Sequence, residues 1–138
     1  MANTLYPLAK PKLRARTVNL TTDTIKAQLV DTGAYTYSAS HEFLSDIPSG
    51  ARIGTAVALA NKAEYYGMFD ADDTIFTSVP AGTGSASAAE AVALYKDTGT
   101  ASTSSLIALF DTATGLPVTP DGGNIKITWD ATGILSLA

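Results

Sequence analysis

Residues 88–129 read AAEAVALYKDTGTASTSSLIALFDTATGLPVTPDGGNIKITW, and this stretch decides the fold of the 138-residue chain. It holds three apolar runs, each of a length that suits one β-strand. Between the first two runs, Asp97-Thr98-Gly99-Thr100 combines side chains that bond nearby backbone amides with a glycine that tolerates positive φ. The stretch therefore predicts three strands, the first two joined by a turn.

The second connection, from Asp111 to Gly123, is too long and too rich in Pro and Gly for a tight hairpin. We expect it to cross between two sheets or to wrap around a sheet edge. Trp129 lies in the third run and is expected to anchor the core. The Ala-rich run 86–93 alternates into Tyr95 and is also assigned to a strand.

Period-two alternation of apolar and polar residues predicts further short strands. They cover residues 25–30, 52–60, 62–69, 74–79 and 134–137. Gly67 interrupts one of them and predicts a bulge. A single short helix is expected over residues 41–47, capped by Ser40 and stopped by Pro48. About eight short strands with turns every 8–12 residues predict an all-β fold, a β-sandwich of the jelly-roll kind.

The first sixteen residues differ from the rest in charge. They hold four of the nine basic residues and no acid, so residues 17–138 carry five basic and thirteen acidic side chains. Pro7 and Pro11 disfavour a regular helix through this segment. We expect residues 1–16 to form an extended N-terminal arm and residues 17–138 a single β-sandwich domain. A loosely ordered terminus and a first strand lying along the domain are the alternatives.

Composition narrows the class of function. The chain has no cysteine, so disulfides and thiolate metal sites are excluded, which fits a cytosolic origin. A net charge of −4 argues against direct binding of nucleic acid, and no apolar run approaches the roughly 20 residues of a membrane span. The N-terminus lacks a signal-peptide pattern. Charged residues make up 16%, below the ~25% typical of globular domains, which fits a surface partly covered by other subunits.

No residue pattern marks an active site. The lone histidine, His41, has no paired nucleophile beside it in the sequence. Asp70, Asp72 and Asp73 are interpreted as an acidic turn, because the further ligands of a calcium loop are missing. The loop 82–85 lacks the lysine and the spacing of a phosphate cradle. The sequence therefore predicts a protein that is not an enzyme, without catalytic residues, metal or cofactor.

Two motifs are the most specific in the chain, YSASHEFLSD at residues 37–46 and TGLPVTP at residues 114–120. Further segments accompany them, at residues 5–10, 23–32, 67–73, 95–100 and 111–123. Together they resemble a family of small structural proteins of tailed bacteriophages. The resemblance implies a virion structural protein. We favour a capsid decoration or cement protein on the capsid exterior, made in the cytoplasm of the bacterial host.

The resemblance also implies partners. A cement protein binds across subunits of the major capsid protein and stabilises the head, and such proteins are often homotrimers. We expect the arm to supply the partner-binding residues, with apolar anchoring stronger than exposed charge. They are Tyr6, Leu8, Lys10, Lys12, Leu13, Arg14 and Arg16. A tail, neck or fibre component is an alternative, as is a carbohydrate-binding module displayed on the virion. The aromatic platform of such a module would come from Tyr35, Tyr37, Tyr65 and Tyr66.

Overall fold

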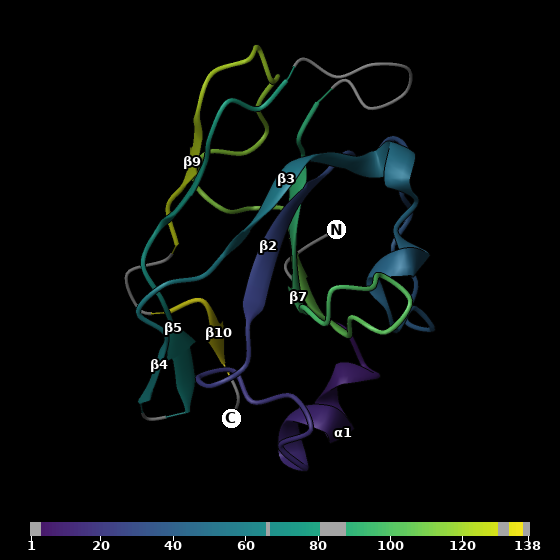
Figure 1. The fold of residues 1–138 in the computed structure, drawn as a ribbon, viewed down its shortest axis with the longest axis vertical. Helices are drawn as coiled ribbons and strands as arrows, with labels where there is room; N and C mark the ends of the chain where they lie inside the picture. The colour runs from purple at the N-terminus through teal and green to yellow at the C-terminus, as the bar shows by residue number, and fades with distance from the viewer. Residues whose placement is uncertain (1–3, 66, 81–87, 130–132, 137–138) are drawn as a thin grey trace.

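The computed structural model describes residues 4–65, 67–80, 88–129 and 133–136, which form mainly short strands (Figure 1). The strands are β1 (Thr4–Leu5), β2 (Ile25–Val30), β3 (Arg52–Ala58), β4 (Ala63–Tyr65), β5 (Met68–Asp70), β6 (Thr74–Phe76), β7 (Ala91–Lys96), β8 (Leu106–Phe110), β9 (Ile125–Ile127) and β10 (Leu135–Ser136). One α-helix, α1 (Ala9–Arg14), and two 3₁₀ turns, η1 (Leu44–Asp46) and η2 (Ser49–Ala51), complete the described elements. The prediction of an all-β fold is confirmed.

The central sheet has five strands in the order β1-β8-β7-β2-β3. A three-stranded sheet has the order β10-β5-β4, and β6 pairs with β9 in a two-stranded sheet. Neighbouring strands are antiparallel throughout. A jelly roll distributes eight strands over two sheets, and the described strands are arranged differently. The jelly-roll part of the prediction is therefore not confirmed.

The three inner strands of the central sheet are covered on both sides, and the buried residues of β7 and β8 are all apolar. All five residues of β8 and five of the six residues in each of β2 and β7 are buried. Near-continuous apolar runs such as AVALY and LIALF are typical of strands covered on both faces. Because successive side chains point to opposite faces, Val92 and Leu94 join one apolar cluster, and Ala93 and Tyr95 join another. The central sheet therefore needs a cover on each face.

The two small sheets cover the first face. The large cluster on this face includes Phe69 of β5, Phe76 of β6, Ile127 of β9 and Leu135 of β10. Trp129 packs edge-on against Phe110 with ring centroids 5.5 Å apart, and its indole N–H donates to Thr74 Oγ1 at 3.2 Å. Trp129 is 7% exposed, which confirms it as a core anchor.

Residues before and after β2 cover the second face. The small cluster on this face takes Tyr6 and Ala9 from the N-terminal segment. It takes Tyr35, Leu44, Ile47 and Ala51 from the connection between β2 and β3. In Figure 1 this connection lies to the right of β7, whereas β4, β5 and β10 lie to the left. The N-terminal segment is therefore part of the core of the domain.

A bulge between β2 and β3 is stabilised by a buried glutamine. From Ala27 to Leu29, two steps along β2 are matched by four steps along β3, from Val57 to Ile53. The Gln28 side chain is buried at this point, and its amide donates to the Ile53 carbonyl at 2.8 Å and to the Leu29 carbonyl at 3.1 Å. The side chain thereby satisfies carbonyl groups where the ladder of backbone hydrogen bonds is interrupted.

The two connections around β8 form as predicted. The Gly99 N–H donates to Asp97 Oδ1 at 3.1 Å, and Gly99 has a φ of 87°, which its lack of a Cβ permits. The connection over residues 111–123 leaves the five-stranded sheet after β8 and reaches β9 in the two-stranded sheet. The predicted crossing between sheets is therefore confirmed.

The predicted helix over residues 41–47 is wrong. Its place is taken by an extended segment and the 3₁₀ turn η1. The Leu44 N–H donates to the Ser104 carbonyl at 2.8 Å, and the Leu106 N–H donates to the Glu42 carbonyl at 2.8 Å. These bonds, to Ser104 and to the first residue of β8, use backbone groups that a helix would pair internally.

Strand boundaries differ from the prediction in the middle of the chain. Residues 63–70 form the hairpin β4–β5 rather than one strand, and Gly67, with a φ of 77°, lies in its turn rather than at a bulge. The fourth predicted strand is shortened to β6. Within the Ala-rich run, β7 begins at Ala91, and residues 81–87 lie outside the described part of the chain.

Replacing Gln28 by Leu should destabilise the domain. The substitution leaves the Ile53 and Leu29 carbonyl groups without their buried donor, so we expect the free energy of unfolding to fall by about 1–3 kcal/mol. Urea denaturation measures this change. Lys26→Leu on the same strand is the control, because it removes only a partly exposed ion pair, worth about 0–1 kcal/mol. Equal losses in the two variants would contradict the role of Gln28.

Candidate protein-binding surface on helix α1

The N-terminal segment folds back onto the domain. β1 pairs with β8, and the Tyr6 N–H donates to the Ile107 carbonyl at 2.9 Å, where the β7–β8 register shifts. The expectation of an extended arm is therefore wrong for residues 4–16, and residues 1–3 lie outside the described part. The domain begins by residue 4 rather than at residue 17.

Helix α1 forms although two prolines lie in the segment. Pro7 precedes the helix, and Pro11 is its third residue. The first N–H groups of a helix have no partner within it, so the missing N–H of a proline costs little there. The Pro11 carbonyl accepts from the Ala15 N–H at 3.0 Å. Arg16 follows with a φ of 58°, which ends the helical conformation.

The inner side of the segment is anchored in its own domain. Tyr6 is 0% exposed and belongs to the small cluster, as does Ala9. Leu13 is partly buried against the large cluster. Both were predicted to bind a partner. The structure instead places Tyr6 fully, and Leu13 partly, within their own domain.

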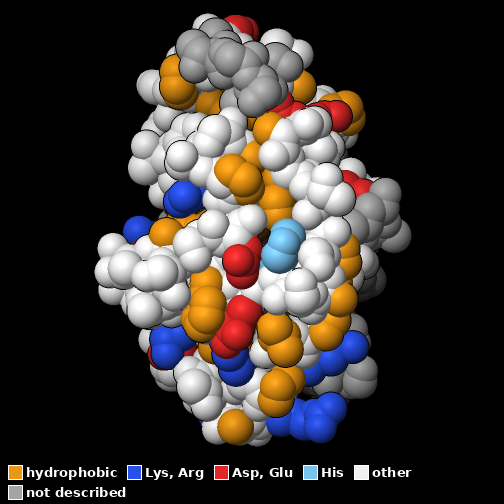
Figure 2. Space-filling model, turned by 90° about the vertical axis from the view of Figure 1, so that its right-hand side faces the viewer, with side chains coloured by type: hydrophobic (Ala, Val, Ile, Leu, Met, Phe, Trp, Pro, Cys, Tyr) orange, Lys and Arg blue, Asp and Glu red, His pale blue; other side chains and the backbone are white. Residues whose placement is uncertain are grey.

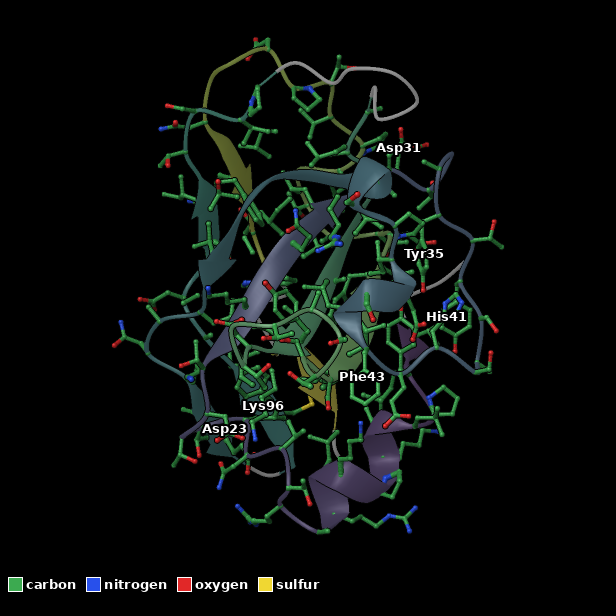
Figure 3. The ribbon with its side chains drawn as sticks, turned by 45° about the vertical axis from the view of Figure 1, so that its right-hand side comes forward. Asp23, Asp31, Tyr35, His41, Phe43 and Lys96 are labelled. Carbon is green, nitrogen blue, oxygen red and sulfur yellow. The ribbon has the colours of Figure 1, made fainter. Side chains whose placement is uncertain are left out.

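A chain of side-chain hydrogen bonds holds Tyr6 in place. Its hydroxyl lies 2.8 Å from the Tyr35 hydroxyl, which in turn lies 2.7 Å from His41 Nδ1. Figure 3 shows Tyr35 and His41 close together on one side of the molecule. Burial, followed by the bond to Tyr35, raises the pKa of Tyr6. Burial also raises the pKa of Tyr35. His41 therefore forms the outer end of a structural chain of hydrogen bonds.

Lys12 attaches the helix to the connection that covers the same face. Its Nζ lies 2.7 Å from Glu42 Oε2 and donates to Ser105 Oγ at 3.0 Å. It also lies 4.7 Å from the centroid of the Phe43 ring, whose face attracts a cation. Lys12 is therefore an internal contact, and its charge is already paired with a carboxylate of the same chain.

The outer side of α1 faces solvent and has a regular arrangement. Leu8, Pro11 and Ala15 are exposed at positions i, i+3 and i+7, which lie on one side of a helix. Lys10 and Arg14 are exposed at i and i+4 and form an adjacent basic row. These five residues and the exposed Arg16 are called the helix surface below.

The helix surface combines apolar groups with basic groups that form no ion pair within the described part of the chain. Leu8 is 38% exposed, and only one other large hydrophobic side chain among the described residues is as exposed. The ion pairs of the described residues do not include Lys10, Arg14 or Arg16. Figure 2 shows hydrophobic and basic side chains side by side at the lower end of the molecule, where α1 lies in Figure 1.

The predicted partner-binding residues thus divide into two groups. The structure brings Leu8, Lys10, Arg14 and Arg16 together on one exposed surface. It turns the other three, Tyr6, Lys12 and Leu13, toward their own domain. The helical spacing of the exposed residues is a usable signal in the sequence, which the two prolines obscure.

Each carboxylate of the acidic turn bonds a different group of the chain. Asp70 accepts a hydrogen bond from the Ala71 N–H, Asp72 from the Asn61 side-chain amide, and Asp73 from the Trp129 N–H. No group of three or more metal-binding side chains occurs among the described residues. The glycine-rich loop 82–85 lies outside them.

The aromatic platform considered for a carbohydrate-binding module is not exposed at Tyr35, which is 4% exposed. Tyr37 is half-buried, with its ring centroid 5.1 Å from that of Tyr6. Tyr66 and the Tyr65 side chain lie outside what the structure describes. A cavity of about 280 Å³ opens beside Tyr35 and Tyr37. The other residues that line it are Thr32, Thr36, Leu109 and Asp111. Tyr35 reaches it from the core and cannot serve as a flat stacking surface.

Comparison with known proteins returned no matching family model and no matching curated protein. Among the described residues, no helix has the length and apolar character needed to cross a membrane. The features that bear on function are therefore the helix surface and the contacts that hold it in place.

Tyr6→Phe should destabilise the attachment of the N-terminal segment. The variant keeps the buried ring but removes the hydroxyl that bonds Tyr35, so we expect a loss of about 0.5–1.5 kcal/mol in the free energy of unfolding. Chemical denaturation followed by circular dichroism measures it. Tyr37→Phe removes a hydroxyl that has no hydrogen bond to another described residue, so this variant should be close to neutral. A Tyr6→Phe variant as stable as the wild type would contradict the role of this bond.

Stability should also fall at alkaline pH. Burial is the first cause that raises the pKa of Tyr6, Tyr35 and Tyr95 above the usual 10.0. The unfolded chain releases the hydroxyl protons of these tyrosines more readily than the folded chain does. The stability that the three tyrosines contribute is therefore complete below about pH 10 and is lost as pH rises through the folded-state pKa. Thermal unfolding between about pH 8 and 11 should show this loss, with a smaller loss in Tyr6→Phe. An equal loss in both proteins would contradict the contribution of Tyr6.

Proposed function

We propose that this chain is a capsid decoration or cement protein of a tailed bacteriophage. It binds across subunits of the major capsid protein on the outside of the head and stabilises the assembled shell. Its partners are the major capsid protein and further copies of the chain itself. The single observation that carries the proposal is the helix surface, an exposed apolar row beside unpaired cations, mounted on a folded domain.

Two segments that resemble phage proteins meet at the base of this surface. Residues 5–10 contain Tyr6, and residues 37–46 contain His41, Glu42 and Phe43. His41 ends the chain of hydrogen bonds from Tyr6, while Glu42 and Phe43 hold Lys12. The segments that carry the resemblance thus contain the residues that hold α1 in place. This supports the use of the helix surface for binding in the virion.

The contacts that fix α1 on the domain make the helix surface suitable for protein binding. Because α1 is already fixed, a partner does not have to order it, and the loss of conformational entropy on binding is reduced. Exposed ion pairs contribute only about 0–1 kcal/mol each, so Leu8 and Pro11 should supply more affinity than the cations. The cations would orient the protein on an acidic partner and speed its encounter.

A position elsewhere in the virion is the alternative. A tail, neck or fibre component would share the fold and the resemblance, and the location of the protein in the particle distinguishes these from a capsid position. A carbohydrate-binding module is less well supported, because Tyr35 is buried and bonded to Tyr6 and His41.

The proposal is tested by sedimenting the purified chain with phage capsids that lack it. We expect the wild type to pellet with capsids and to raise their resistance to heat. Leu8→Ser should weaken binding by roughly tenfold, because it removes an apolar anchor, and Lys10→Ser with Arg14→Ser should weaken it less. Thr119→Ser is the control, since residue 119 is exposed and lies outside α1, on the connection between β8 and β9.

Failure of the wild type to bind capsids would contradict a decoration role. If the wild type binds and Leu8→Ser binds equally well, the chain is a decoration protein that uses a different surface. Circular dichroism of each variant confirms that the fold is retained, because all the substituted side chains are exposed.

A further inference from the structure

The chain of hydrogen bonds from Tyr6 to His41 leads from the core to the surface of the molecule. Tyr6 and Tyr35 are 0% and 4% exposed, whereas His41 is half-buried. The Tyr35 hydroxyl lies between the other two groups, 2.8 Å from the Tyr6 hydroxyl and 2.7 Å from His41 Nδ1 (Figure 3). None of the three side chains makes a further hydrogen bond to a described residue. Two hydrogen bonds therefore join three polar atoms.

Two hydrogen bonds between three atoms use two protons, and the two tyrosine hydroxyl groups already supply them. Both bonds are complete when Tyr6 donates to Tyr35 and Tyr35 donates to His41 Nδ1. In this arrangement Nδ1 is an acceptor and carries no proton. The chain of hydrogen bonds therefore favours the neutral imidazole that has its proton on Nε2.

Protonation of His41 adds a third proton to the chain of hydrogen bonds. The Nδ1–H group must then donate to the Tyr35 oxygen, so one tyrosine proton has to leave the two bonds. That proton has no other acceptor among the described residues, and both tyrosine side chains are buried away from water. A buried donor without an acceptor destabilises the state that contains it. The cationic imidazole therefore fits poorly with a Tyr6 hydroxyl held in the core.

The charged groups near His41 are too exposed to reverse this effect. The backbone N–H groups of Phe43 and Glu42 lower the pKa of Asp46 in η1, and His41 makes a smaller contribution. Asp46 is exposed, so solvent screens its attraction for a cationic imidazole. The Glu42 carboxylate is already paired with Lys12 of α1. A screened ion pair stabilises by less than an unsatisfied buried donor costs.

We propose that His41 is a pH sensor that controls how tightly the N-terminal segment is held on the domain. The neutral imidazole completes the hydrogen bonds of Tyr6, and the segment stays on the second face of the central sheet. Histidine takes up its proton in the range of about pH 5–8. In that range the folded chain binds this proton less readily than the unfolded chain, so the stability present at higher pH is lost as the pH falls.

This sensor would regulate the helix surface. Tyr6 lies three residues before Ala9, the first residue of α1, so loosening Tyr6 also loosens the helix. The importance of this loosening for capsid binding rests on the proposed function, whereas the sensor itself does not. At neutral pH the helix surface is held in place for a partner, and in mild acid it is held less tightly.

The protonation state of the imidazole tests the proton count directly. The chain has one histidine, so isotope-labelled protein gives the nitrogen chemical shifts of a single imidazole. At about pH 8 we expect a proton on Nε2 and none on Nδ1. A neutral imidazole with its proton on Nδ1 would overturn the proposal.

Stability as a function of pH tests the consequence. His41→Asn is the matched control, because its side-chain oxygen can accept from Tyr35 near the position of Nδ1 and does not titrate. Relative to this variant, the unfolding equilibrium constant of the wild type should rise roughly tenfold between about pH 7.5 and about pH 5.5. The protection of the Tyr6 amide against hydrogen exchange should fall by the same factor. A wild type that follows His41→Asn over this range would overturn the proposal.

Tyr35→Phe separates this mechanism from the titration of a histidine outside the chain of hydrogen bonds. The variant removes the hydroxyl that joins His41 to Tyr6, so the pH dependence assigned to His41 should disappear. If it persists, His41 does not act through Tyr35, and the proposal fails. All of these measurements use the free protein. A wild type that does not bind capsids would therefore reject the proposed function and leave the sensor in place.

Discussion

The central sheet is apolar on both faces, and the rest of the fold follows from the need to cover it. β7 and β8 contribute nearly unbroken buried runs, so neither face can be left in water. The small sheets cover one face, and they bring Phe76, Trp129 and Leu135 with them. The connection from β2 to β3 and the N-terminal segment cover the other. Covering the second face is what places α1 where it is.

Because the second face must be covered, the N-terminal segment is fixed on the domain, although its sequence resembles a free arm. Tyr6 fills the second face, and the hydrogen bonds through Tyr35 to His41 hold it there. Lys12 of α1 adds an ion pair with Glu42 on the connection between β2 and β3. With its inner side used in this way, the segment presents only its outer side, where apolar and basic groups are held in a fixed arrangement for a partner.

Local patterns are sufficient for the all-β class, for β2, for the turn at Asp97–Thr100 and for the core position of Trp129. They fail where distant partners decide the conformation. Residues 41–47 have a helical pattern, but their backbone groups bond the loop that precedes β8. Pro11 argues against a helix in the sequence, although in the first turn its missing N–H costs little. The unalternating run at 106–110 indicates a sheet covered on both sides, but not which segment covers it.

Hydrogen exchange at the Tyr6 amide tests most directly whether the N-terminal segment belongs to the core. Its N–H donates to the Ile107 carbonyl beneath the second face of the sheet. If the segment is an integral cover, this amide exchanges only through global unfolding, with the same protection as the Leu94 amide in β7. Rapid exchange at Tyr6 while Leu94 stays protected would show that the N-terminal segment detaches from a folded domain. That result would contradict the claim that α1 is held in a fixed position.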